Sequence, residues 1–139
     1  MSDMIEFKNN ISIEEFRRLR ESVGFQKLTA GQAEAVLSKT SFVVNAVYEG
    51  KSVGVVRVFT DFITDAYITD VIITPDFQGR GLGRKLINNV LAYLKENSVS
   101  DVKLTCSLYA NPGKEGFYEK FGFQKLPNEK YGYGMLLEL

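Results

Sequence analysis

The chain has 139 residues, of which 45% are hydrophobic and 24% charged, and its 17 basic and 17 acidic side chains cancel. This composition is typical of a soluble globular protein, and the zero net charge gives no support for a nucleic-acid or anionic-membrane partner. With no histidine and a single cysteine, Cys106, the sequence excludes an internal disulfide and histidine-dependent catalytic triads, and it argues against a metal site.

The chain shows neither a membrane span nor a targeting segment. No apolar run approaches the ~20 residues that a transmembrane helix needs. The first residues, Met-Ser-Asp-Met-Ile-Glu, lack the basic segment and apolar run of a signal peptide. We therefore expect a reduced, cytoplasmic protein that folds as one domain over residues 1–139.

The N-terminal part predicts a short strand and two helices. Met4–Lys8 alternates as a strand does, and Ser12 and Glu15 have capping-box spacing before a helix over Ile13–Ser22. The three arginines Arg17, Arg18 and Arg20 are expected to point largely outward from this helix. A second capping pair, Thr29 and Gln32, opens a helix that ends near Ser38.

In the middle of the chain, the spacing of apolar residues changes from that of helices to that of strands. Ser41–Tyr48 and Ser52–Thr60 are rich in valine and aromatic residues and flank the turn Glu49-Gly50-Lys51, which predicts a hairpin. Asp65–Thr74 predicts the next strand, which Pro75 ends. Apolar residues at helical spacing predict a helix from Leu82 to about Asn97.

The last third predicts three further strands and a helix. Val102–Leu108 predicts a strand, and Asn111-Pro112 favours a helix start, with Gly122 as its stop. Phe123–Leu126 and Tyr133–Leu139 are expected to close the chain as strands. The sequence contains no repeat or linker, which favours one mixed α/β domain.

The segment Gln78-Gly79-Arg80-Gly81-Leu82-Gly83-Arg84, here called the glycine loop, is the most informative part of the sequence. A glycine-rich turn at a helix start leaves backbone N–H groups free at the positive end of the helix dipole, which favours a bound phosphate. It is not a Walker loop, because Arg84-Lys85-Leu86 follows Gly83 in place of Lys-Ser/Thr. It does not follow the first strand of a βαβ unit, as a dinucleotide-binding loop would.

Together with a second segment, the glycine loop resembles the GNAT superfamily of acyl-CoA-dependent N-acyltransferases. The loop resembles the family's Gln/Arg-x-x-Gly-x-Gly/Ala motif through Gln78, Gly81 and Gly83. The second segment resembles its Asn-x6-Tyr-x-Lys-x-Gly-Phe pattern, which is met here by Asn111, Tyr118, Lys120, Gly122 and Phe123. The resemblance implies the GNAT fold, a mixed and mostly antiparallel sheet of about 6–7 strands flanked by about four helices.

The resemblance also implies that the protein transfers an acetyl group from acetyl-CoA to a primary amine. The family's loop amides hold the diphosphate of coenzyme A, and the preceding strand pairs with the pantetheine amides. The residues that take these positions here are Val71, Ile72, Ile73, Gln78, Gly79, Arg80, Gly81, Leu82, Gly83 and Arg84, and Asn111 matches a family asparagine that contacts coenzyme A. Asn111 is also a natural helix N-cap, and the cations of the loop can equally be solvated.

Two residues are candidates for proton transfer. Tyr118 matches the family tyrosine that protonates the leaving thiolate, although a tyrosine beside Phe117 and Phe121 is often only part of a core. Asp70 is the nearest acidic candidate for the base, either directly or through water, but it could equally bond a backbone turn. Tyr67 stands where some relatives carry a glutamate base. Cys106 is expected to be structural.

The acceptor is expected to be a small amine, such as an aryl or alkyl amine, an amino sugar or a polyamine-like molecule, because tyrosine and phenylalanine are frequent in the segments that line the family's acceptor site. A protein lysine or N-terminus stays open as acceptor. A non-catalytic acyl-CoA sensor and a nucleotide-binding domain are the alternatives from other classes. A strand edge or a helix face could also mediate the contact between two copies of the chain in a homodimer.

Overall fold

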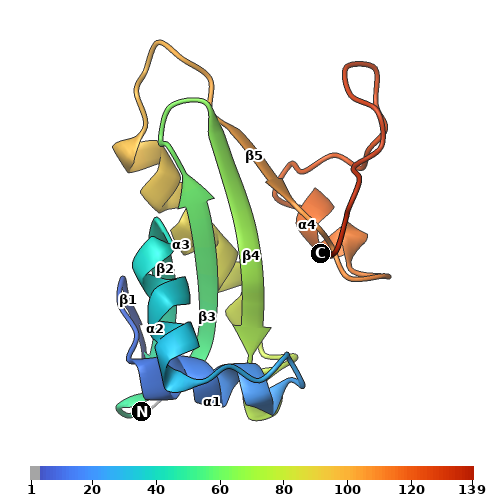
Figure 1. Ribbon diagram of the computed structural model, residues 1–139. Coiled ribbons are helices and arrows are strands. Elements are labelled where there is room, and N and C mark those ends of the chain that lie inside the picture. Colours follow the sequence, from blue (N-terminus) through green and yellow to red (C-terminus); the bar gives the residue numbers. More distant parts are fainter. Residues whose placement is uncertain (1–3) are drawn as a thin grey trace. The chain divides into compact units, whose positions relative to one another are not determined.

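The computed structural model describes residues 4–139, and the chain divides into two compact units, Met1–Ser107 and Leu108–Leu139. The first unit holds the central sheet and the three longer helices, which are labelled in Figure 1. The second unit holds one short helix. The expectation of one domain over residues 1–139 stays a prediction. No helix among residues 4–139 combines the length and apolar character needed to span a membrane.

The sheet has five strands in the order of the chain. They are β1 (Ile5–Lys8), β2 (Phe42–Tyr48), β3 (Lys51–Thr60), β4 (Asp65–Ile73) and β5 (Thr105–Leu108). The three pairs from β1 to β4 are antiparallel. The mixed α/β class and mostly antiparallel sheet are therefore confirmed, with fewer strands than predicted.

Local sequence signals set the first two helices. In α1 (Ile13–Ser22), the Ser12 hydroxyl accepts from the Glu15 amide. In α2 (Ala30–Lys39), Thr29 and Gln32 form a complete capping box. Both caps satisfy amides that a helix start leaves without partners, which confirms the predicted starts.

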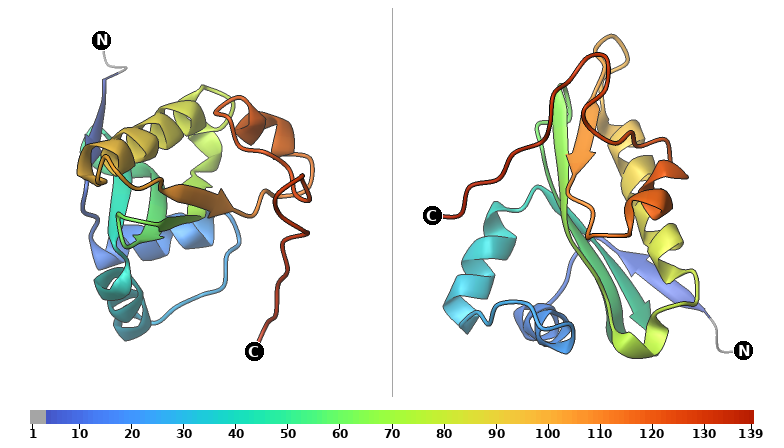
Figure 2. Two further views of the ribbon diagram at one scale, coloured as in Figure 1. Left: turned by 90° about the horizontal axis from the view of Figure 1, so that it is seen from above. Right: turned by 90° about the vertical axis from the view of Figure 1, so that its right-hand side faces the viewer.

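The helices cover both faces of the sheet. Figure 2 (right) shows α1 and α2 on one face and α3 (Leu82–Asn97) on the other. Phe16 and Leu19 of α1 are fully buried with Val43, Val55 and Ile72 of the sheet. The buried stripe of α3 consists of Leu82, Leu86, Ile87, Val90 and Leu94. Two apolar layers against one sheet explain why β2 and β3 are buried along nearly their whole length.

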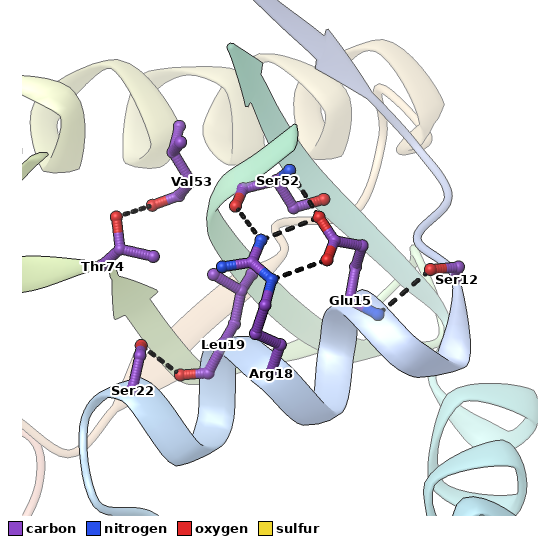
Figure 3. A network of polar contacts seen from close by, with 8 residues as sticks. All are labelled: Ser12, Glu15, Arg18, Leu19, Ser22, Ser52, Val53 and Thr74. Carbon is purple, nitrogen blue, oxygen red and sulfur yellow. Dashed lines mark hydrogen bonds and ion pairs between the residues drawn. The ribbon is translucent and has the colours of Figure 1, made fainter. Parts of the chain in front are cut away.

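A polar network fastens α1 to the start of β3 (Figure 3). Glu15 pairs with Arg18 at 2.7 Å and accepts from the Ser52 amide at 2.9 Å, while an Arg18 Nη donates to the Ser52 carbonyl at 2.6 Å. The hydrogen bond from Arg18, with that from the Ser52 amide, holds the pKa of the Glu15 carboxyl below its ordinary value of 4.5. Next to it, the amide of Thr74 donates to the carbonyl of Val53 at 3.0 Å and closes the end of β4 against β3.

Strand β4 contains a β-bulge. Arg57 pairs with Thr69 and Val55 pairs with Ile72, so Asp70 and Val71 together stand opposite Val56. Asp70 adopts a positive φ of 48°. The extra residue lets Thr69 and Ile72, three positions apart, share the face that α1 covers, because cross-strand partners lie on the same face and side chains alternate along a regular strand.

The second unit corrects two predictions. Its helix α4 spans Glu115–Glu119 with Lys114 as N-cap, so the helix start predicted at Asn111-Pro112 is wrong. The strands predicted at Phe123–Leu126 and Tyr133–Leu139 are absent from the described chain, which has no regular structure after α4. Tyr133 and Leu137 are 78% and 80% exposed. Without a partner strand, an apolar alternating pattern does not satisfy the backbone groups of a strand.

Candidate functional site: the glycine loop and the end of strand β4

The glycine loop joins the 3-10 turn Pro75–Phe77 to α3. Gly79 and Gly81 have φ values of 77° and 81°, which L side chains rarely adopt, and a Cβ at either position would meet nothing within 4 Å. These glycines are therefore required by the backbone turn and not by crowding within the protein. They leave the outer side of the loop open.

The first amides of α3 follow this loop directly and lack backbone acceptors. Gly81 is the N-cap and offers no side-chain hydrogen bond, and the first turn contains no acidic residue. Within residues 4–139, the amide of Lys85 bonds the Gly81 carbonyl, but those of Leu82, Gly83 and Arg84 find no backbone acceptor. Free amides at the positive end of a 16-residue helix fit an anionic group such as a diphosphate.

Gln78 fixes the loop to the strand before it. Its side-chain amide donates to the carbonyl of Ile73, the last residue of β4, at 2.9 Å. This bond connects the glycine loop with the end of β4. The family resemblance assigns both segments to the binding of coenzyme A. Ile72 is buried, whereas Val71 and Ile73 are partly exposed.

The cations of the loop lie on the surface. The Arg80 guanidinium lies 4.7 Å from the centre of the Phe77 ring, and Arg84 and Lys85 are exposed. Arg80 and Lys85 also line a cleft of about 280 Å³ together with Ile5, Tyr48, Phe77 and Leu82. Cations beside the open amides add to the positive potential there.

Asp70 lies in the β4 bulge, with its carboxylate occupied by two guanidinium groups. Its Oδ2 atom lies 2.6 Å from Arg57 Nε and 3.2 Å from Arg20 Nη1. The prediction that Arg20 points largely outward is wrong, because its side chain is only 12% exposed. Sequence reasoning missed both arginines as partners of Asp70, since they lie 13 and 50 residues away along the chain.

Tyr118 lies on α4 in the second unit, within a small aromatic group. Its ring makes edge contacts with Phe117 and Phe123, at centroid distances of 5.0 and 6.0 Å. Burial raises the pKa of the Tyr118 phenol above its ordinary value of 10. The hydroxyl therefore stays protonated at neutral pH, as a proton donor must.

Asn111 and Cys106 take ordinary structural positions. The Asn111 carbonyl accepts from the Lys114 amide at 2.9 Å in the turn before α4, and its side chain is exposed. Cys106 lies on β5, and burial raises the pKa of its thiol to about 11. A thiol with so high a pKa is a poor nucleophile at neutral pH. Among residues 4–139, no group of three or more Asp, Glu, Cys or His side chains lies close enough to hold a metal.

The comparisons with known proteins agree with the motifs. The model of the family "Acetyltransferase (GNAT) family" matches residues 7–123. A relative from Pyropia yezoensis, the uncharacterized N-acetyltransferase ycf52, is 34% identical over 137 residues, which cover 91% of this chain and 76% of that protein. Serotonin N-acetyltransferase 2 of Oryza sativa, a chloroplastic protein, is 35% identical over 79 residues, or 57% of this chain and 38% of its own length.

The fold is also shared with solved structures. A crystal structure from meticillin-resistant Staphylococcus aureus, described as a protein of unknown function and probable acetyltransferase, has a TM-score of 0.80 and 28% sequence identity. The similarity covers 98% of this chain and the whole of the other.

Proposed function

Because the chain belongs to the acetyltransferase (GNAT) family and is an N-acetyltransferase, we propose that it transfers the acetyl group of acetyl-CoA to the primary amine of a small molecule. The observation that carries this proposal is the glycine loop, where the amides of Leu82, Gly83 and Arg84 have no backbone acceptor at the start of α3. A diphosphate is the group in acetyl-CoA that matches such a site.

The residues of the first unit would hold and orient the acyl donor. The glycine loop binds the diphosphate, and Arg80 and Arg84 add contacts to its oxygens. The end of β4, Val71 to Ile73, pairs with the peptide-like part of the donor as an added strand would. The donor supplies the thioester that the amine attacks.

Proton transfer to the leaving group would use the Tyr118 hydroxyl. The attacking amine must be neutral, so it first loses a proton to solvent or to an ordered water. When the C–N bond has formed and the C–S bond breaks, the Tyr118 hydroxyl gives its proton to the departing thiolate. The nitrogen loses its extra proton to solvent, and the Tyr118 phenolate regains a proton from solvent. The raised pKa of the Tyr118 phenol keeps that proton available at neutral pH.

We propose an acceptor with a flat or apolar body. Phe25 and Phe59 are 37% and 39% exposed, and they lie against the guanidinium groups of Arg20 and Arg57 at 5.5 and 5.3 Å. Such rings offer stacking surfaces to an aryl or alkyl amine. The name of the Oryza sativa relative, a serotonin N-acetyltransferase, supports an arylalkylamine as the first class to test.

The test is a thiol-release assay with acetyl-CoA and a panel of acceptors. The panel contains arylalkylamines, amino sugars, polyamines and a lysine-containing peptide. We expect turnover with at least one small amine and higher kcat/KM for arylalkylamines than for the peptide. Tight CoA binding with no turnover on any acceptor would instead indicate an acyl-CoA sensor. Thermal stabilisation by ATP and not by CoA would indicate a nucleotide-binding domain.

A further inference from the structure

The Asp70 carboxylate is the centre of a buried ionic cluster made by Arg20, Arg57 and Asp70. One oxygen, Oδ2, accepts from Arg57 Nε at 2.6 Å and from Arg20 Nη1 at 3.2 Å. The exposed fractions of the three side chains are 11–12%. Each charge is therefore largely removed from water, and the pairs are much less screened than surface ion pairs.

The cluster joins β4, which carries Asp70, to four other segments of the first unit. Arg20 belongs to α1 and also donates to the Gln26 carbonyl at 2.9 Å, in the segment between α1 and α2. Arg57 belongs to β3 and donates to the Thr40 hydroxyl at 3.0 Å. Both guanidinium groups lie within 6 Å of the centre of the buried Phe16 ring. The two cations therefore have few alternative positions.

Asp70 connects this cluster to the bulge of β4. The positive φ of Asp70 is uncommon for a residue other than glycine, and it persists only where surrounding contacts enforce it. The bulge in turn decides which side chains after it face α1, because a shift by one residue exchanges the two faces of a strand. Ile72 in the core and Ile73 opposite Gly54 both depend on it.

We propose that Asp70 is a positioning residue and not the proton acceptor of the reaction. Its ion pairs with Arg57 and Arg20 hold the β4 bulge, and so hold Val71 to Ile73 in the register that receives the acyl donor. This inference rests on the proposed function, because the donor is assigned to that strand end. It differs from the sequence-based expectation, in which Asp70 accepts a proton from the amine.

The test compares Asp70→Asn with Arg57→Gln, because Arg57→Gln removes the shorter of the two ion pairs of Asp70 while leaving the carboxylate in place. In each variant the Kd for CoA, the KM for acetyl-CoA, kcat and the pH dependence of kcat/KM are measured. We expect both variants to weaken CoA binding about tenfold or more and to lower kcat, since small displacements of a binding strand cost up to ~10²-fold. The shape of the pH profile should not change, and the double variant should be no worse than the poorer single one.

Matched controls use the same residue types at positions that do not touch the cluster. Arg18→Gln removes an α1 ion pair that does not touch Asp70, and Asp101→Asn removes an exposed carboxylate in the turn before β5. Both should retain the CoA affinity of the unaltered protein. Asp70→Glu keeps a carboxylate and should recover part of the lost affinity. If Asp70→Asn does not fold, Arg57→Lys takes its place in the comparison with Arg57→Gln. Lysine keeps the positive charge but loses the planar fork of arginine, so Arg57→Lys should also weaken CoA binding without changing the shape of the pH profile.

The proton-acceptor role would instead be established by a different pattern. Asp70→Asn would then lose turnover and the ascending limb of the pH profile at unchanged CoA affinity, while Arg57→Gln stayed active, and this result overturns the proposal. Hydrogen exchange of the β4 amides gives a readout independent of activity, with faster exchange expected in Asp70→Asn and Arg57→Gln but not in Asp101→Asn. If the unaltered protein neither binds CoA nor turns over, the proposed function fails, and hydrogen exchange still decides whether Asp70 holds the bulge.

Discussion

Gly54 of β3 lies against Leu86 of α3 so closely that a Cβ at position 54 would stand 2.9 Å from the Leu86 Cδ1 atom. The same Cβ would lie 3.2 Å from the carbonyl oxygen of Ile72. The missing side chain of Gly54 therefore sets how near α3 approaches the sheet. The helix that begins at the glycine loop depends on this contact for its position.

Replacement of Gly54 by alanine should destabilise the protein. The added methyl group forces Leu86 or the helix to move, and overpacking of this kind costs about 1–3 kcal/mol. Urea unfolding of Gly54→Ala measures the loss. The control is Gly31→Ala in α2, where a Cβ meets nothing within 4 Å, and it should raise stability by about 0.4–1 kcal/mol. Equal stability of Gly54→Ala and the unaltered protein would contradict the close contact.

A charged side chain in the glycine loop should abolish binding of the acyl donor. Gly81→Glu places a negative group at the amides proposed to hold the diphosphate, and it strains a backbone with φ of 81°. Gly81→Ala introduces the strain without the charge, and Gly24→Glu introduces both at a positive-φ glycine after α1. Calorimetric titration with CoA should show no binding to Gly81→Glu and unchanged binding to Gly24→Glu. Unchanged affinity in Gly81→Glu would place the diphosphate elsewhere.

Removal of the Tyr118 hydroxyl should slow turnover. The phenylalanine variant keeps the aromatic contacts but cannot protonate the thiolate, so kcat should fall by roughly ten- to a thousandfold. Because burial raises the pKa of the phenol above its ordinary value, activity of the unaltered protein should not decline through loss of this proton at neutral or mildly alkaline pH. Tyr93→Phe, on α3 and stacked on Phe42, is the control for loss of a hydroxyl. Full turnover in Tyr118→Phe would remove this residue from the mechanism.

The Glu15 network should make stability depend on pH in the acid range. The pKa of Glu15 is lowered in the folded protein. The ionised carboxylate therefore stabilises the fold at pH values above the ordinary pKa of 4.5, and this stabilisation is lost as the pH falls through the folded-state pKa. Glu15→Gln should therefore be less stable than the unaltered protein at pH 7, with a difference that shrinks at pH 3 to 4. Urea unfolding at both pH values measures this difference. A difference independent of pH would show that the charge of Glu15 contributes nothing.

Features encoded by neighbouring residues were predictable. The caps at Ser12 and Thr29, the hairpin around Gly50 and the start of α3 after Gly81 each depend on residues within one turn of each other. The same holds for the glycine loop, because its residues form the turn among themselves. Family membership followed from this loop and the segment around Tyr118.

Features that depend on distant partners were not predictable. The surroundings of Asp70 arise only when α1, β3 and β4 meet, and no local pattern indicates the bulge that brings Asp70 to Arg57. The segments Phe123–Leu126 and Tyr133–Leu139 carry strand-like patterns, but a strand forms only where another strand completes its hydrogen bonds. The start of α4 was predicted wrongly for a different reason, because the Asn111 carbonyl closes a turn with the amide of Lys114, and the helix begins only after that turn, at Glu115.

The agreement between strand order and chain order from β2 to β4 also has a kinetic consequence. Each of these strands pairs with its immediate successor, so the meander from Phe42 to Ile73 closes through short loops at a small entropic cost. The contacts of Arg18 with Ser52 and of Arg20 with Asp70 span 34 and 50 residues, and they gain nothing until that meander exists. Folding is therefore expected to begin in β2–β4, with α1 docking onto a sheet that has already formed.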